Sequence, residues 1–167
     1  RAGNVIGGGD WAEDRLIPDI LLSLQNKRNP LIRNPNSTRP WQHVLEPLTG
    51  YLRLIEKMNE QPGNYSEAWN FGPNPEDVKE VKWITEKIID IWGDNLSWEF
   101  ESLVNNKESK LLMLDITKVK KRLEWHPKWN IETAIEKVVK WHKSWLSGEN
   151  ALELCKNDIQ SFIGEDK

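Results

Sequence analysis

The sequence predicts an α/β fold that is mostly helical, with short strands that form an incomplete sheet. Short apolar stretches that favour strands alternate with longer segments whose apolar residues recur every three to four positions, as in amphipathic helices. Glycine and proline separate these segments. The 167 residues, 38% hydrophobic and 29% charged, suit one domain with a hydrophobic core. The strands are too few and too short for a complete doubly wound sheet.

The expected elements follow from apolar spacing and from turn residues. The third helix has two possible starts, because Asn74 and Pro75 resemble a cap and first turn while the periodicity begins near Val78. In order, we expect a strand at 2–6, a helix at 14–26, strands at 31–33 and 42–45, a helix at 47–61, a strand at 68–71, the third helix up to 92, strands at 97–101 and 111–114, a short helix at 115–123, a long helix at 130–147 and an amphipathic helix at 152–162.

Composition excludes several classes of function. The net charge is −3 with both signs mixed along the chain, unlike the basic face of a nucleic-acid binder. The single Cys155 rules out an internal disulfide, and its place on the apolar stripe of the last helix favours packing. The three histidines lie far apart, which argues against a metal site. No apolar run approaches the roughly 20 residues of a membrane span, and no signal peptide is visible, so a cytoplasmic location is expected.

Arginines near the ends of predicted elements form the candidate site. Arg33 and Arg39 flank a proline-containing loop, and arginine can grip a phosphate with two parallel hydrogen bonds. Ligands of α/β folds gather beyond the carboxyl ends of strands. Each arginine alone is more often a solvated surface charge, but together with Asn4, Arg15 and Glu108 they favour an anionic ligand such as a diphosphate. The glycine turn at 7–9 lacks the spacing of a dinucleotide fingerprint.

Three stretches resemble the CDP-glucose 4,6-dehydratase family of the extended short-chain dehydrogenases/reductases. They are RAGNVIGGGDWAEDRLIPDI at 1–20, RNPNSTRPWQHVLEPL at 33–48 and EAWNFGP at 67–73. The segment 123–127 resembles the usual ending of many nucleotide-sugar enzymes of this superfamily. The similarity runs to about residue 147.

The resemblance implies an NAD-dependent lyase that removes water from CDP-glucose to give CDP-4-keto-6-deoxyglucose. In that chemistry a hydride passes from C4 to NAD, water leaves across C5 and C6, and the hydride returns at C6. The pathway would supply deoxysugars for surface polysaccharide such as lipopolysaccharide. Residues 1–167 would be the C-terminal substrate-binding portion, comprising the last Rossmann elements and a small α/β lobe. A homodimer or tetramer that binds a CDP-sugar, and neither nucleic acid nor membrane, is expected.

The family's binding residues carry over to matching positions. Asn4 would meet the sugar diphosphate below the nicotinamide, and Arg39 would grip the pyrophosphate. The others are Arg15 and Leu16 along the nucleotide, Arg33 beside the base and ribose, Glu108 at the nucleotide, and Ala2, whose backbone would pass the nicotinamide.

The chain also departs from the family. Tyr51 and Tyr65 lack a lysine four residues later, so the catalytic Tyr-x-x-x-Lys pair and the NAD-binding half are expected upstream of the first residue. The 167-residue chain alone should therefore be inactive. The neighbours of Glu108 differ from the family's. Glu124 stands where the family has a glycine in a left-handed turn, so that turn is expected to differ.

Two other interpretations stay open. The chain could belong to another nucleotide-sugar dehydratase or epimerase that uses a UDP-, dTDP- or GDP-sugar. It could also be a non-catalytic interaction module whose arginines lie on an ordinary surface.

Overall fold

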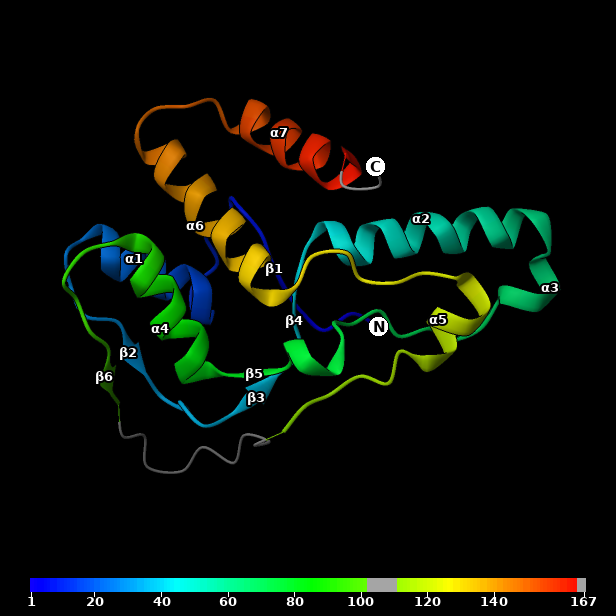
Figure 1. The fold of residues 1–167 in the computed structure, drawn as a ribbon, viewed down its shortest axis with the longest axis horizontal. Helices are drawn as coiled ribbons and strands as arrows, with labels where there is room; N and C mark the ends of the chain where they lie inside the picture. Colours follow the sequence, from blue (N-terminus) through cyan, green and yellow to red (C-terminus); the bar gives the residue numbers. More distant parts are fainter. Residues whose placement is uncertain (102–110, 165–167) are drawn as a thin grey trace.

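The computed structural model describes residues 1–101 and 111–164 and confirms a helix-rich α/β fold with short strands (Figure 1). The helices are α1 (Leu16–Gln25), α2 (Leu45–Glu60), α3 (Pro62–Tyr65), α4 (Val81–Trp92), α5 (Thr117–Leu123), α6 (Ile131–Leu146) and α7 (Ala151–Gly164), with a 3-10 helix at Pro75–Asp77. The strands are β1 (Asn4–Ile6), β2 (Leu31–Ile32), β3 (Thr38–Arg39), β4 (Trp41–His43), β5 (Lys79–Glu80) and β6 (Glu99–Phe100).

The strands pair two by two within the described residues. β1–β4 and β2–β6 are parallel, whereas β3–β5 is antiparallel. The chain before β1 also bridges Phe71 in parallel, through the bond from the Gly3 amide to the Phe71 carbonyl at 3.2 Å. The first segment therefore lies between β4 and Phe71, which is the interior position of a small parallel sheet.

Several short elements differ from the sequence predictions. The strands expected at 68–71 and 111–114 are reduced to isolated bridges at Phe71 and Leu111. Asn74 and Pro75 begin the 3-10 helix, and the third long helix starts only at Val81. β3, β5 and α3 were not expected, because elements of two to four residues are too short to show a periodicity.

Two clusters of buried side chains form the core. The larger one joins α1, α4 and α6 through side chains such as Leu24, Ile84 and Ile135. The smaller one joins Phe71, α5 and Trp125. Gly50 brings α2 against this smaller cluster, because a Cβ there would lie 2.3 Å from the Phe71 ring.

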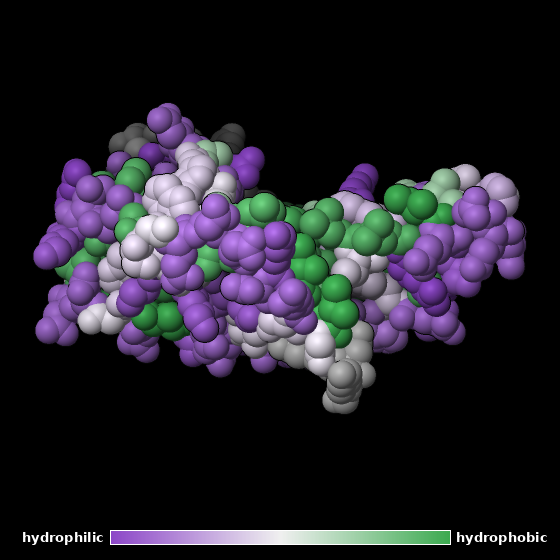
Figure 2. Space-filling view, turned by 90° about the horizontal axis from the view of Figure 1, so that it is seen from above, coloured by the Kyte–Doolittle hydropathy of each residue, from purple (hydrophilic) through white to green (hydrophobic). Residues whose placement is uncertain are grey.

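The opposite face of α2 carries an exposed apolar stripe. Leu48, Leu52 and Ile55 follow one another at helical spacing, and all three are exposed. Figure 2 views the molecule from the side on which α2 and α7 lie, and hydrophobic residues are exposed on this side. α2 is therefore apolar on two sides.

The start of α6 is held by side chains from three parts of the chain. Its cap residue Asn130 accepts a hydrogen bond from the Thr133 amide at 2.9 Å, as predicted. Asp77 accepts from the Ile131 amide at 3.0 Å. Glu46, on the first turn of α2, accepts from the amides of Lys128 and Trp129 at 3.1 and 2.7 Å. These bonds satisfy amides that the first turn of a helix leaves without helical partners and the loop amides before it.

The tail differs from expectation in two places. Glu124 has a φ of 52°, so the left-handed turn is retained without glycine, and the expected change in that turn is wrong. Cys155 is exposed rather than packed, because Leu154 and Phe162 are the buried residues of α7. The inward stripe of α7 thus includes Leu154, one position away from the predicted one.

Candidate functional site

A cavity of about 900 Å³ lies between α1, β1, β2 and β4. Its lining combines apolar side chains of α1 with polar groups from loops and strand ends. Five of the residues proposed from sequence line this one cavity: Asn4, Arg15, Leu16, Arg33 and Arg39. The structure therefore brings together residues that are up to 35 positions apart (Asn4 to Arg39).

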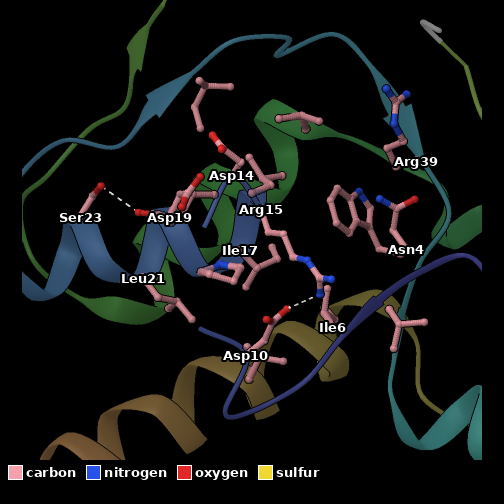
Figure 3. A pocket seen from close by; sticks show the side chains of 18 of the residues that line it. Asn4, Ile6, Asp10, Asp14, Arg15, Ile17, Asp19, Leu21, Ser23 and Arg39 are labelled. Carbon is pink, nitrogen blue, oxygen red and sulfur yellow. Dashed lines mark hydrogen bonds and ion pairs between the residues drawn. The ribbon is translucent and has the colours of Figure 1, made fainter. Parts of the chain in front are cut away.

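The pairing of β1 with β4 builds one end of the cavity. Asn4 lies opposite Trp41 in the parallel register, and Arg39 ends β3 two residues before Trp41. Figure 3 shows the Asn4 and Arg39 side chains at the same end of the pocket. The Arg39 side chain is buried, with 8% of the residue exposed, and its Nη1 donates to the Thr38 carbonyl at 3.0 Å. Trp41 is also buried, and its indole N–H has no hydrogen-bond partner among the described residues.

Arg15 and Leu16 stand at the start of α1, where helical N–H groups give a partial positive charge. Arg15 extends into the cavity, and its Nη1 lies 3.1 Å from Oδ2 of Asp10 (Figure 3). The other oxygen of Asp10 accepts a hydrogen bond from the Ala12 amide at 3.1 Å. Asp10 therefore shapes the turn before α1 and binds the arginine at its start.

Arg33 also contacts carboxylates. Its Nε donates to Oε2 of Glu101 at 2.9 Å, and its Nη1 lies 3.5 Å from Oδ1 of Asp14. The hydrogen bond with Glu101 raises the pKa of Arg33, which stays a cation. Burial and the nearby Asp14 raise the pKa of the Asp19 carboxyl, which lines the same cavity.

These carboxylates are the site residues that sequence reasoning missed. Asp10 and Asp14 stand within five residues before Arg15, and this local clustering of opposite charges was a usable signal. Glu101 had no such signal, because it reaches the cavity by the pairing of β6 with β2 and stands 68 positions from Arg33.

Two predicted site residues are not brought to the cavity by the described structure. Ala2 is half-buried, bridges Phe71 and does not line the cavity. Glu108 lies outside the described residues. Gly8 belongs to the cavity wall, but a Cβ there would lie 2.2 Å from the Trp141 ring, so this glycine permits close packing of the turn on α6.

The cavity suits an anionic ligand with an extended apolar part. Its volume lies in the range of small-molecule pockets, and its arginines can each offer paired N–H groups to phosphate oxygens. Within residues 1–101 and 111–164, no three His, Cys, Asp or Glu side chains are grouped so as to hold a metal ion. None of the helices described for this chain is both long enough and apolar enough to cross a bilayer.

Comparison with curated sequences gives a clear relative, although no family model matches the chain. CDP-glucose 4,6-dehydratase of Salmonella typhimurium is 48% identical over 163 residues. That alignment covers 98% of this chain and 45% of the relative. The chain thus spans about half the length of the curated relative that it matches.

Solved structures share the fold at lower identity. UDP-glucose 4-epimerase of Thermotoga maritima, solved with UDP-glucose, has a TM-score of 0.76 and 20% identity over 87% of this chain and 45% of its own. UDP-glucuronic acid 4-epimerase of Bacillus cereus, solved with UDP-glucuronic acid and NAD, has a TM-score of 0.74, 18% identity and coverages of 87% and 44%. dTDP-glucose 4,6-dehydratase of Bacillus anthracis, solved with NAD, has a TM-score of 0.69, 20% identity and coverages of 86% and 43%.

Proposed function

We propose that this chain, which is 48% identical to CDP-glucose 4,6-dehydratase over 98% of its length, is the substrate-binding portion of such a dehydratase in the extended short-chain dehydrogenase/reductase superfamily. The full protein would convert CDP-glucose to CDP-4-keto-6-deoxyglucose for deoxysugar and surface polysaccharide synthesis. It would act in the cytoplasm as a homodimer or tetramer. Residues 1–167 would hold the nucleotide sugar, and the other half would hold NAD and the catalytic tyrosine and lysine.

The single observation that carries the proposal is the convergence of five residues on one cavity. Asn4, Arg15, Leu16, Arg33 and Arg39 match the family's nucleotide-sugar positions, and all five line the same space of about 900 Å³. A nucleotide sugar is long, flat at its base and charged at its centre. Arginines along one cavity, with apolar side chains from α1, suit that shape and charge.

In this proposal each residue has a binding role. Arg39, buried beside Asn4, would hold the diphosphate as a fixed anchor. Arg15 and the start of α1 would meet the same charge from another side, since helix N-termini favour anions. Leu16 and Arg33 would lie along the nucleotide.

NAD is the cofactor expected of the full protein, and two of the similar structures contain it. When bound, NAD supplies the hydride acceptor and donor of such a reaction. The described residues do not form a dinucleotide cradle of their own, because Gly8 is packed on Trp141 and a Cβ at Gly3 would lie 2.3 Å from the Pro40 carbonyl oxygen. We therefore assign NAD binding mainly to the other half of the full protein.

Calorimetric titration of the 167-residue chain with pyrophosphate and with CDP tests the proposal. Arg39→Ala should weaken binding of both by about tenfold or more, the size of a lost charge-assisted hydrogen bond. Arg39→Lys keeps the charge but loses the paired donors, so its affinity should lie between those of the unaltered chain and Arg39→Ala. Arg28→Ala, at an exposed position away from the cavity, is the matched control. Thermal unfolding of each variant checks folding, and equal affinity in a folded Arg39→Ala protein would contradict the proposal.

Comparison of CDP with UDP, dTDP and GDP separates the alternatives. Preference for CDP supports the proposed substrate, and preference for another nucleotide points to a different dehydratase or epimerase. No binding of any nucleotide would favour an interaction module. The chain should not convert CDP-glucose by itself, and measurable turnover would contradict the assignment of the catalytic residues to the other half.

A further inference from the structure

The charges that line the cavity pose a difficulty for a diphosphate. Among the described lining residues, four carboxylates accompany three arginines, so the carboxylates outnumber the arginines by one. The carboxylates are those of Asp10, Asp14, Asp19 and Glu101. A diphosphate brings at least two further negative charges, and like charges within a few ångströms repel one another. The carboxylates of the lining therefore oppose the ligand that the arginines should attract.

The two exposed arginines of the cavity, Arg15 and Arg33, are each already paired with a carboxylate. Arg15 binds Asp10 at 3.1 Å, and Arg33 binds Glu101 at 2.9 Å. The arginine side chains are 64% and 49% exposed, whereas those of Asp10 and Glu101 are only 30% and 34% exposed. The carboxylates are thus the better-fixed members of each pair, and the arginines face the space that a ligand would fill.

We propose that Asp10 and Glu101 act as internal counter-ions, which occupy Arg15 and Arg33 until a diphosphate displaces them. This inference rests on the proposed function. Asp10 and Glu101 are positioning residues here, since they act through the arginines. Their exchange for phosphate oxygens sets how tightly the ligand is held and how readily it leaves.

Exchange is feasible because the bonds to be broken are weak. Ion pairs between exposed side chains contribute little to stability, whereas an arginine can bind a phosphate through two charge-assisted hydrogen bonds. Asp10 also keeps its place when Arg15 leaves, because its Oδ1 is bound to the Ala12 amide. Arg39 differs from both, since it is buried and its bond to the Thr38 carbonyl fixes its side chain.

The rival interpretation is that these carboxylates aim the arginines at the ligand and stay bound to them. The two interpretations predict effects of opposite sign. Under exchange, removing the charge of Asp10 frees Arg15 and tightens binding. Under aiming, the same change releases Arg15 into solvent and weakens binding.

The test is a calorimetric titration of the 167-residue chain with inorganic pyrophosphate at one fixed ionic strength. Asp10→Asn removes the charge but keeps an oxygen for the Ala12 amide. Glu101→Gln likewise removes the charge beside Arg33. Each should tighten binding by about two- to fivefold, the range of an exposed ion pair. Glu56→Gln on α2, which removes an exposed charge outside the cavity, controls for net charge.

A double-variant cycle separates exchange from general repulsion. In an Arg15→Ala background, Asp10→Asn should leave the affinity unchanged, because its arginine is gone. Tightening of the same size in that background would overturn exchange in favour of long-range repulsion. Weaker binding by Asp10→Asn and Glu101→Gln alone would overturn exchange in favour of aiming, and unchanged binding would overturn both interpretations. If the unaltered chain does not bind pyrophosphate, the proposed function itself fails.

Discussion

Glu46 couples the stability of this chain to pH, and replacing it isolates the effect. Glu46 is fully buried, and burial raises the pKa of its carboxyl from 4.5 to about 7. The hydrogen bonds from the Trp129 and Lys128 amides act in the opposite direction, because they favour the ionised form. The pKa of Glu46 therefore reports which of the two influences is larger.

The sign and size of the pH effect follow from linkage. Between pH 4.5 and 7 the unfolded chain has lost this proton and the folded chain keeps it, so the free energy of unfolding falls as pH rises. The full loss is ~3 kcal/mol, from a shift of about 2.5 pH units at 1.36 kcal/mol each. Burial lowers the pKa of the neighbouring His43 to about 4, so His43 contributes stability that rises with pH between about 4 and 6.5. In the wild type the two contributions oppose each other over most of this range.

Glu46→Gln removes one titration and leaves that of His43. The variant keeps one oxygen for the Trp129 and Lys128 amides and loses the second acceptor of the Lys128 amide, which costs about 0.5–1.5 kcal/mol at low pH. As pH rises from 4.5 to 7.5, the wild type should lose ~3 kcal/mol relative to the variant. Urea unfolding followed by tryptophan fluorescence at several pH values measures this difference. A difference that stays constant across the range would refute the reasoning and mean that the backbone amides keep Glu46 ionised.

Two further changes test strain and packing. Glu124→Gly should raise the free energy of unfolding by ~1 kcal/mol, because glycine adopts the left-handed φ of 52° without steric cost and the 3.7 Å pair with Arg53 is exposed. This corresponds to about 2–4 °C in thermal unfolding, and a lower midpoint would show that the ion pair outweighs the strain. Gly8→Ala should destabilise by about 1–3 kcal/mol, since its Cβ would meet the Trp141 ring at 2.2 Å. Gly63→Ala, with no atom within 4 Å, is its control, and equal midpoints for the two would contradict the packing argument.

The long helices could be predicted because their apolar spacing and caps are local signals. α6 begins after Asn130 as the sequence indicates, and its inward face carries apolar residues at helical intervals. The short strands could not be predicted in the same way. β3 and β5 each have two residues, and they exist because Val81 and Lys82 donate backbone hydrogen bonds to the loop at Ser37 and Pro35. Such pairings depend on which loops meet in the folded chain.

In the candidate site, too, residues within local motifs could be predicted and residues placed by tertiary contacts could not. The arginines were identified from the motifs around them, and the structure brings Arg15, Arg33 and Arg39 to one cavity. Their carboxylate partners depend on tertiary structure, as Glu101 reaches Arg33 only after β6 pairs with β2. Glu46 is a similar case. Its burial depends on the packing of α2 against the segment before α6, where the Lys128 amide that it binds lies 82 positions later in the chain.

The start of α6 has a consequence for local motion. Helix ends commonly fray, and their first amides then exchange with solvent hydrogen quickly. Here the amides of Lys128, Trp129 and Ile131 are bonded to Glu46 and Asp77, which belong to elements 54 to 83 positions away. These amides can open only when distant elements separate. Their deuterium exchange should therefore follow global unfolding, so that one helix end reports on the integrity of the whole chain.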